Sequence, residues 1–393
     1  MRRIAVVLVG LLCACAAPPH EFPTDATVSS ASPAASPVPV GRSPGSYTGP
    51  YAVLVAQPVD PRRYMVAIVS SDGRIVASAT GDRPSARYGR ELPKVSTSRT
   101  AVYYLDGDAE VKMLRPDGTV RSAIGVPGGF DDRVVFAVDP EDHRVAVTVA
   151  HFGPPPPACP TNCEPTVGFR LYVEDLRGPA HVDVAWPAVL SGYGALAYPV
   201  GWRNGILVTA MSAGVTRTQS WENPYAAYEF PLIDVASGRV VGRFGYNRSA
   251  PSCETNGPLV SAGAACYGLG WGVSIESWEG SRRTLTGNAE AYQPPAALAP
   301  GGSAVAIGTS ASSKIVLLDG TSPASSTPPR LTGVSGTPIG WIDDRYLVFA
   351  RAPGSVAVLD ASTLAVTPVD LANATFEVMA SSTFFAMLPS RLE

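Results

Sequence analysis

The sequence has 393 residues and a net charge of −3, and only 16% of its residues are charged. Nucleic-acid binding needs clustered cations that neutralise phosphates, so this composition argues against nucleic acid and we expect no such partner. The chain is long for one ordinary domain. A repeat architecture accommodates that length, because it adds units without thickening a single core.

Residues 1–15 are expected to be an export signal. Arg2 and Arg3 precede an apolar run over residues 4–12, which is too short to span a bilayer as a permanent helix. The next residues, Leu-Cys-Ala-Cys at 12–15, resemble a bacterial lipobox. This resemblance implies that Cys15 is lipidated and anchors the protein on the outer side of the cytoplasmic membrane. Plain secretion is the alternative.

Residues 16–47 are expected to form a disordered tether. They are rich in Pro, Ser, Ala and Thr and offer few apolar side chains that could pack. As a flexible coil, the tether would hold its cargo on the order of 30 Å from the membrane.

Residues 48–393 repeat one pattern of apolar strands and tight turns, with no helical period. Repetition of strands at about forty residues per unit predicts an all-β fold, a β-propeller, and the count of hairpins predicts seven blades. The seven hairpins expected to form the outer halves of the blades begin at Ile68, Val111, Leu171, Phe230, Ser274, Ile315 and Val356.

Both ends of this region are expected to share one blade. Residues 375–388 follow the seventh hairpin with no other partner, so they should pair with the blade that contains residues 51–56 and 64–70. Such closure removes a free sheet edge. Two Gly-Trp pairs, at Trp202 and Trp341, occupy equivalent positions in the repeat and predict packing between blades.

The repeat is similar to that of a known group of propellers. LAPGGSAVAIG from Leu298 and AVDPEDHRVAVTV from Ala137 resemble the strand, Pro-Asp-Gly-like turn and Val-Ala strand of TolB-like and WD40-like β-propeller repeats. The resemblance implies a propeller carried by an exported lipoprotein of actinobacterial type. Such propellers serve both as binding scaffolds and as enzymes.

Three long insertions are expected to crowd one sector of one face. They lie at residues 151–168, 212–227 and 245–257, in connections that emerge on the same side of a four-stranded blade. Function in propellers commonly lies on loops held by the scaffold. The aromatic residues expected to bind a ligand there are Phe152, Trp221, Tyr225 and Tyr246. The alternative is that these rings only pack the loops.

An arginine group is expected on the same face, around the first two blades. It comprises Arg62, Arg63, Arg83, Arg87 and Arg90. These side chains could bind a carboxylate or a phosphate, and the alternative is a solvated loop.

Four cysteines remain in the folded part after export, and an even number in an oxidising compartment predicts disulfides. Three pairings are possible, and the favoured one joins Cys159 to Cys163 and Cys253 to Cys266, because each pair is local. A zinc site with His151 beside the first two cysteines fails on ligand spacing, and we expect no metal.

The familiar signatures of hydrolases and nucleotide-binding enzymes do not occur in the sequence. Asp106, Asp108 and Glu110 could form a Ca²⁺ loop, but such hairpin turns are usually only solvated. We therefore expect no cofactor and a monomeric, non-catalytic, lipid-anchored envelope protein that binds a protein or glycan. The alternative is an extracellular propeller hydrolase or lyase that acts on an envelope polymer at the mouth of its channel.

Overall fold

The fold is known from a computed structural model. It describes residues 49–85, 95–152, 167–184, 196–212, 230–245, 257–268, 272–286, 291–322, 328–351, 354–371, 374, 385–390 and 392. These residues all belong to one compact unit, Pro37–Glu393. They form β-strands and contain no α-helix. Accordingly, no helix in this part of the chain has the length and hydropathy to cross a bilayer.

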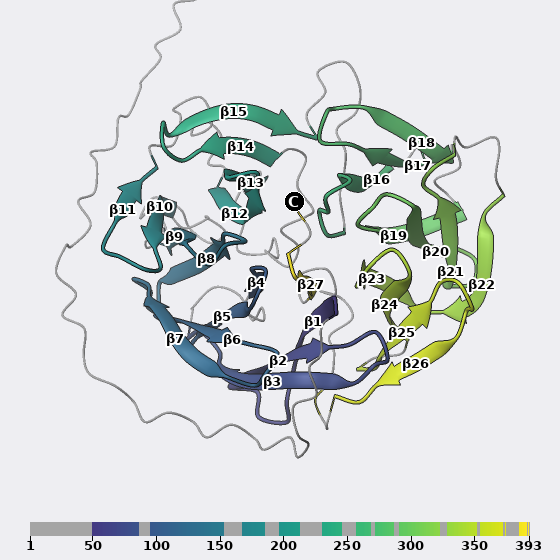
Figure 1. The fold of residues 1–393 in the computed structure, drawn as a ribbon, viewed down its shortest axis with the longest axis horizontal. Coiled ribbons are helices and arrows are strands. Elements are labelled where there is room, and N and C mark those ends of the chain that lie inside the picture. Colours follow the sequence, from purple (N-terminus) through teal and green to yellow (C-terminus); the bar gives the residue numbers. More distant parts are fainter. Residues whose placement is uncertain are drawn as a thin grey trace, which may run out of the picture. The chain divides into compact units, whose positions relative to one another are not determined.

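Seven antiparallel sheets are arranged as a β-propeller (Figure 1), which confirms the predicted fold class and blade count. Blade 1 has the order β27-β1-β2-β3, and every later blade follows the chain outward from its inner strand. The strands of blades 1 to 3 are β27 (Phe385–Leu388), β1 (Tyr51–Ala56), β2 (Arg63–Val69), β3 (Ile75–Asp82), β4 (Val95–Thr97), β5 (Val102–Asp106), β6 (Glu110–Leu114), β7 (Val120–Gly125), β8 (Asp132–Val138), β9 (Arg144–Phe152), β10 (Val167–Asp175) and β11 (His181–Asp183).

Blades 4, 6 and 7 each have four described strands, and blade 5 has three. These strands are β12 (Leu196–Arg203), β13 (Ile206–Ser212), β14 (Phe230–Asp234), β15 (Arg239–Phe244), β16 (Ala264–Gly268), β17 (Gly272–Glu276), β18 (Arg282–Thr286), β19 (Tyr292–Leu298), β20 (Ala304–Thr309), β21 (Lys314–Asp319), β22 (Arg330–Ser335), β23 (Thr337–Trp341), β24 (Tyr346–Ala350), β25 (Val356–Asp360) and β26 (Val366–Val369).

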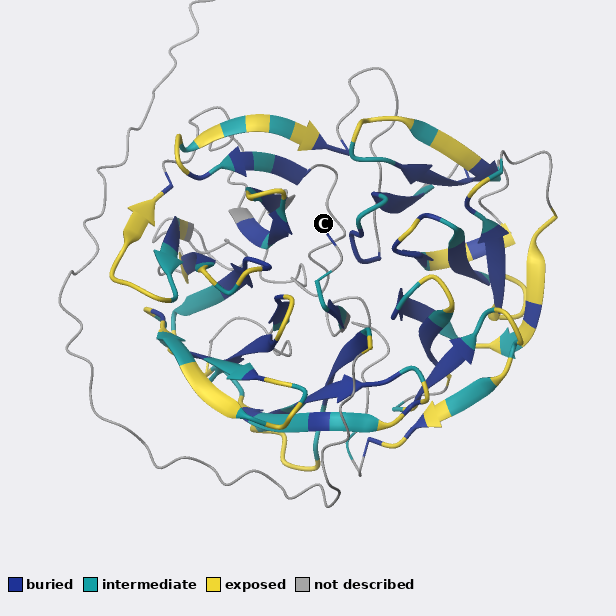
Figure 2. Ribbon diagram, viewed as in Figure 1, coloured by how far each residue is buried: buried dark blue, intermediate teal, exposed yellow. Residues whose placement is uncertain are grey.

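The seven predicted outer hairpins are all present, as β2–β3, β6–β7, β10–β11, β14–β15, β17–β18, β21–β22 and β25–β26. Six of them carry an aspartate whose carboxylate accepts the backbone N–H two residues further on, which closes the turn. The outermost strands are the most exposed, whereas the inner strands are largely buried (Figure 2).

The ring closes as the sequence predicts. β27 pairs antiparallel with β1, with Tyr51 opposite Leu388 and Leu54 opposite Phe385. All six residues of β1 are buried. The C-terminal part of the chain therefore covers an edge of β1 that would otherwise be an unpaired, wholly apolar strand.

The hydrophobic cores lie between neighbouring blades. Trp202 and Trp341 are each 1% exposed and fill two of these interfaces. The Trp202 indole donates to Ala137 O at 3.0 Å, from blade 4 to blade 3, and the Trp341 indole donates to Ala297 O at 2.9 Å, from blade 7 to blade 6. The prediction of inter-blade packing by the two Gly-Trp pairs is confirmed.

The residues after β27 cross the inside of the ring (Figure 1), which the sequence did not predict. Ser390 N donates to Ser98 O of blade 2 at 2.9 Å. Leu392 is 7% exposed and packs in a cluster with Val135 of blade 3 and Tyr198 of blade 4. The described residues of this tail, 389, 390 and 392, therefore tie blade 1 to blades 2, 3 and 4.

Gly201 on β12 makes room for the tail. A Cβ at this position would lie 2.1 Å from Leu392 Cδ1. We expect Gly201→Ala to push Leu392 out of its site and to reduce the free energy of unfolding by about 1–3 kcal/mol, as overpacking does. In a Leu392→Ala background the clash is gone, so the same change should be neutral or slightly stabilising. Urea unfolding of the four proteins measures this coupling, and equal costs in both backgrounds would contradict it.

Candidate functional site

A pocket of about 180 Å³ lies where blade 4 meets blade 5. Figure 1 shows the end of β15 beside the β17–β18 hairpin, and these elements form its walls. The side chains that line it are those of Arg243, Phe244, Glu276, Trp278, Glu279 and Arg282. Four of these six are charged, so the pocket is built for polar contacts.

The β17–β18 turn presents Trp278 and Glu279 to this pocket. Gly280 has a φ of 79°, which glycine adopts readily, and its N–H donates to Ser277 O at 2.9 Å. The turn is therefore tight, with Trp278 and Glu279 at its two central positions.

Trp278 is held in place by its neighbours. Its indole N–H donates to Val260 O at 2.8 Å, and its ring centroid lies 4.3 Å from that of Phe244. The Arg203 guanidinium lies 5.0 Å from the centroid of the same indole. Contacts of this kind fix the indole's orientation before any ligand arrives.

The charged groups in the pocket include both hydrogen-bond donors and acceptors. Glu276 is 5% exposed, and its Oε2 accepts from Arg282 Nη2 at 2.6 Å and Nε at 3.1 Å. This pair satisfies a carboxylate that would otherwise be costly to bury. A hydrogen bond from Ser277 and the nearby Arg203 lower the pKa of Glu279, so this residue stays ionised near neutral pH.

The sequence did not predict this pocket. The segment from Ser274 was predicted only to form the outer hairpin of a blade. A signal was present, because Trp278 stands between two glutamates inside a turn, where a large apolar side chain has no core of its own. The partner wall, Phe244 with Arg243, comes from another blade, and a single hairpin cannot reveal it.

Most of the aromatic residues predicted to bind a ligand lie outside the described residues. Trp221, Tyr225 and Tyr246 are among these, and Phe152 ends β9 without a described side chain. The strands that flank the three insertions follow the predicted order, with connections β9–β10, β13–β14 and β15–β16. The role of these four residues stays a prediction. Gly245 borders the pocket and directly precedes Tyr246.

The structure brings three of the five predicted arginines together, and Arg87 and Arg90 lie outside the described residues. Arg62 is exposed on the β1–β2 connection, and its carbonyl accepts from Arg83 N at 2.8 Å. The Arg63 guanidinium lies 3.5 Å from Asp82. These contacts join the β1–β2 connection to the segment that leaves β3, and a ligand at this place stays a prediction.

The acidic turn of blade 2, which contains Asp106 and Asp108, binds a neighbouring segment of the chain and is not merely solvated. Asp106 accepts from Asp82 N at 2.6 Å and from Lys112 Nζ. Asp108 accepts from Ser85 N at 2.6 Å. These carboxylates thus fasten the segment that leaves blade 1 onto blade 2, and charge-assisted bonds of this kind are among the stronger ones.

Only one of the four predicted disulfide cysteines is described. Cys266 on β16 is buried and disulfide-bonded. Cys159, Cys163 and Cys253 lie outside the described residues, as do the predicted lipid-bearing Cys15 and the predicted tether. His151 Nδ1 lies 2.7 Å from Asp132 Oδ1, and within the described part of the chain no group of three His, Cys, Asp or Glu could hold a metal.

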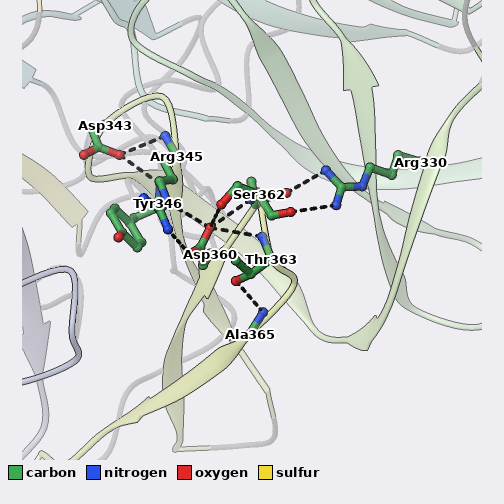
Figure 3. A network of polar contacts seen from close by, with 9 residues as sticks. Arg330, Asp343, Arg345, Tyr346, Asp360, Ser362, Thr363 and Ala365 are labelled. Carbon is green, nitrogen blue, oxygen red and sulfur yellow. Dashed lines mark hydrogen bonds and ion pairs between the residues drawn. The ribbon is translucent and has the colours of Figure 1, made fainter.

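The hairpin turns of blade 7 are held by their own side chains (Figure 3). Arg345 donates to Asp360 through Nη2 at 2.6 Å and Nε at 3.0 Å, and this pairing lowers the pKa of the Asp360 carboxyl. Arg330 of blade 6 donates to Ala361 O at 2.7 Å, across the interface between the two blades. The network makes these turns rigid and links neighbouring blades.

Few charged residues belong to the innermost strands. Among the described residues of β27, β4, β8, β12, β16, β19 and β23, only Asp132, Arg133 and Arg203 are charged. The tail with Leu392 crosses the same region. The described inner strands thus present mostly small and apolar residues.

The fold and the site define a closed seven-bladed β-propeller with a polar pocket between two blades. No protein-family model matches the chain. No curated protein matches it either.

Several solved structures are similar to this chain. TolB from Acinetobacter baumannii aligns with 85% of this chain and 66% of its own, at 12% identity and a TM-score of 0.37. This chain thus spans just under two thirds of TolB. The Cps50 (Swd1) β-propeller domain from Myceliophteria thermophila aligns with 82% of this chain and 96% of its own, at 12% identity and a TM-score of 0.40.

A puromycin-hydrolysing peptidase from Mycobacterium tuberculosis aligns with 81% of this chain and 53% of its own, at 15% identity and a TM-score of 0.48. Similarities this distant say nothing about activity. The assignment of the fold stands on the blade topology described above.

Proposed function

We propose that this protein is an exported, lipid-anchored propeller that binds a protein or glycan of the cell envelope without catalysing a reaction. Cys15 carries the lipid, and residues 16–47 act as a tether between the membrane and the ring. The ring works as a monomer on the outer side of the cytoplasmic membrane. Its partner contacts the face that carries the three insertions.

One observation supports this proposal: the described strands that flank the three insertions follow one another as β9–β10, β13–β14 and β15–β16. In consecutive antiparallel four-stranded blades these connections leave on the same side, so we infer that the insertions share one face. Loops held by such a scaffold are the usual place of binding in propellers. Gly245, the first residue of the third insertion, borders the pocket between blades 4 and 5.

The composition of the described inner strands supports a binding function for the ring more than a catalytic one. A hydrolase or lyase with its site at the channel mouth needs acids and bases that converge there. Here Leu392 packs inside the ring against residues of blades 3 and 4, and the described inner strands contribute three charged residues.

We further propose that Cys253 pairs with Cys266 and Cys159 with Cys163. Cys266 is buried on β16, in the blade that follows the third insertion, so a bond to Cys253 would fix this loop to that blade. The bond would close a loop of roughly 14 residues, worth about 3 kcal/mol in the chain-entropy model.

The proposal predicts that the partner is lost when the insertion aromatics are removed. The protein is recovered from intact envelopes with its bound partners, and the wild type is compared with Trp221→Ala and Tyr225→Ala. We expect each change to lower the recovery of partners about tenfold or more, because buried aromatic residues are common hot spots of interfaces.

Two controls make this result specific. Leu331→Ala removes an exposed apolar side chain from β22 in blade 6 and should leave recovery unchanged. Mass spectrometry of the mature N-terminus should find acyl chains on Cys15 in the wild type and none in the Cys15→Ala protein. Unchanged recovery with both aromatic variants would refute the proposed face, and a wild-type Cys15 without acyl chains would refute the anchor.

A further inference from the structure

The pocket between blades 4 and 5 has the size of a site for one small group. Its volume of about 180 Å³ corresponds to roughly six water molecules at about 30 Å³ each. Pockets for drug-sized ligands are larger, about 300–1,000 Å³. The site therefore suits one ring-sized unit, and a longer ligand would continue outside it.

The charges of the pocket disfavour a charged ligand. Arg243 and Arg282 oppose Glu276 and Glu279, so an anion would meet two carboxylates and a cation would meet two guanidinium groups. Desolvating a charged group beside like charges is unfavourable. A neutral ligand avoids this repulsion.

Hydroxyl groups match this lining, because each one both donates and accepts. Guanidinium N–H groups donate and carboxylate oxygens accept, and both kinds line the same small space. Trp278 borders the pocket, and its ring packs on Phe244, which is 2% exposed, at 4.3 Å between centroids. The surface of the pocket is therefore mainly polar, and its donors and acceptors match a ring with hydroxyl groups at its edge.

The surface around the pocket is exposed and could hold the further units of a polymeric ligand. Arg243 is exposed on β15, and Val241 on the same strand is 57% exposed. Arg283 is exposed on β18, next to the Arg282 that lines the pocket. A polymeric ligand with one unit in the pocket could therefore extend along the outer strands of blades 4 and 5.

We infer that the pocket between blades 4 and 5 binds one neutral sugar unit of a glycan chain. The inference deepens the proposed function, on which it rests, by assigning the glycan to a site formed by Arg243, Glu276, Trp278, Glu279 and Arg282. The proposed role of the insertion aromatics is separate from this site.

The test uses the full-length protein and direct binding measurements. Isothermal titration with neutral sugars, namely glucose, galactose, mannose, arabinose, N-acetylglucosamine and oligomers of each, is compared with titration of inorganic phosphate and acetate. We expect at least one sugar series to bind, more tightly as oligomer than as monomer, and to change the fluorescence of Trp278. Phosphate and acetate should not compete.

Variants then locate the bound sugar. Glu279→Gln and Arg243→Ala should each weaken it about tenfold, the effect of losing one hydrogen bond to a charged group. Arg283→Ala, on the exposed side of β18, is the matched control and should not change binding. Both pocket residues changed here are exposed, and melting temperatures equal to that of the wild type verify that the variants fold.

Each outcome decides the question. Binding of phosphate or acetate but of no sugar, binding of no probe, or sugar binding that both pocket variants retain would overturn the inference. The Trp221→Ala and Tyr225→Ala proteins should keep their sugar affinity. If these two proteins lose their envelope partners and keep their sugar affinity, both proposals stand. If no sugar binds in the pocket but the two variants still lose their envelope partners, only the sugar site is refuted and the proposed partner face stands.

Discussion

Removal of residues 385–393 is expected to unfold the ring. The deletion takes away β27 and the tail, and with them the buried side chains of Met387, Leu388 and Leu392. Burial of three such side chains contributes on the order of 5–9 kcal/mol, against a total stability of about 5–15 kcal/mol for a typical domain. The deletion also uncovers β1, whose six residues are all buried. Circular dichroism during heating, together with size-exclusion chromatography, measures the loss of the folded monomer.

A shorter deletion separates the contribution of the tail from that of the strand. Removal of residues 391–393 leaves β27 paired with β1 and eliminates the contacts of Leu392, the residue of these three that the structure describes. We expect this protein to fold with a reduction of about 2 kcal/mol in the free energy of unfolding, the value for one buried leucine. An unchanged melting temperature after the longer deletion would show that β27 does not close the ring.

Trp202→Ala is expected to destabilise the ring strongly. The indole is 1% exposed between blades 3 and 4, and the Arg144 guanidinium lies 4.5 Å from its ring centroid. Replacing a buried tryptophan by alanine leaves a large cavity, and typical costs are about 3–5 kcal/mol. The free energy of unfolding is measured by urea denaturation followed by circular dichroism.

Trp202→Phe removes the hydrogen bond and keeps part of the packing. Phenylalanine keeps an aromatic ring but lacks the N–H that donates to Ala137 O, so a buried carbonyl loses its partner. We expect a cost of about 1–3 kcal/mol, below that of alanine. Trp341→Phe should behave alike, because its indole makes the equivalent bond to Ala297 O. A cost below about 1 kcal/mol for Trp202→Ala would contradict the inter-blade role.

The roles of the acidic turn and the tail show why sequence reasoning succeeds within a blade and fails between blades. Asp72 and Asp117 close turns with their own neighbours, so the sequence alone predicts those turns. Asp106 and Asp108 instead bind backbone groups more than twenty residues away. Their spacing suggested a cation loop or a solvated turn, because nothing local identifies the partner.

The local sequence pattern by itself determined that this chain folds into seven β-sheet blades and that its two ends share one of them. Alternating apolar residues and turn residues act over short separations, and the repeat fixes the number of units. Only the tertiary structure decided that Leu392 crosses the ring to Gly201, and that Phe244 of one blade and Trp278 of the next enclose a polar pocket. Both features depend on side chains brought together from separate blades, and no short-range signal in the sequence encodes such contacts.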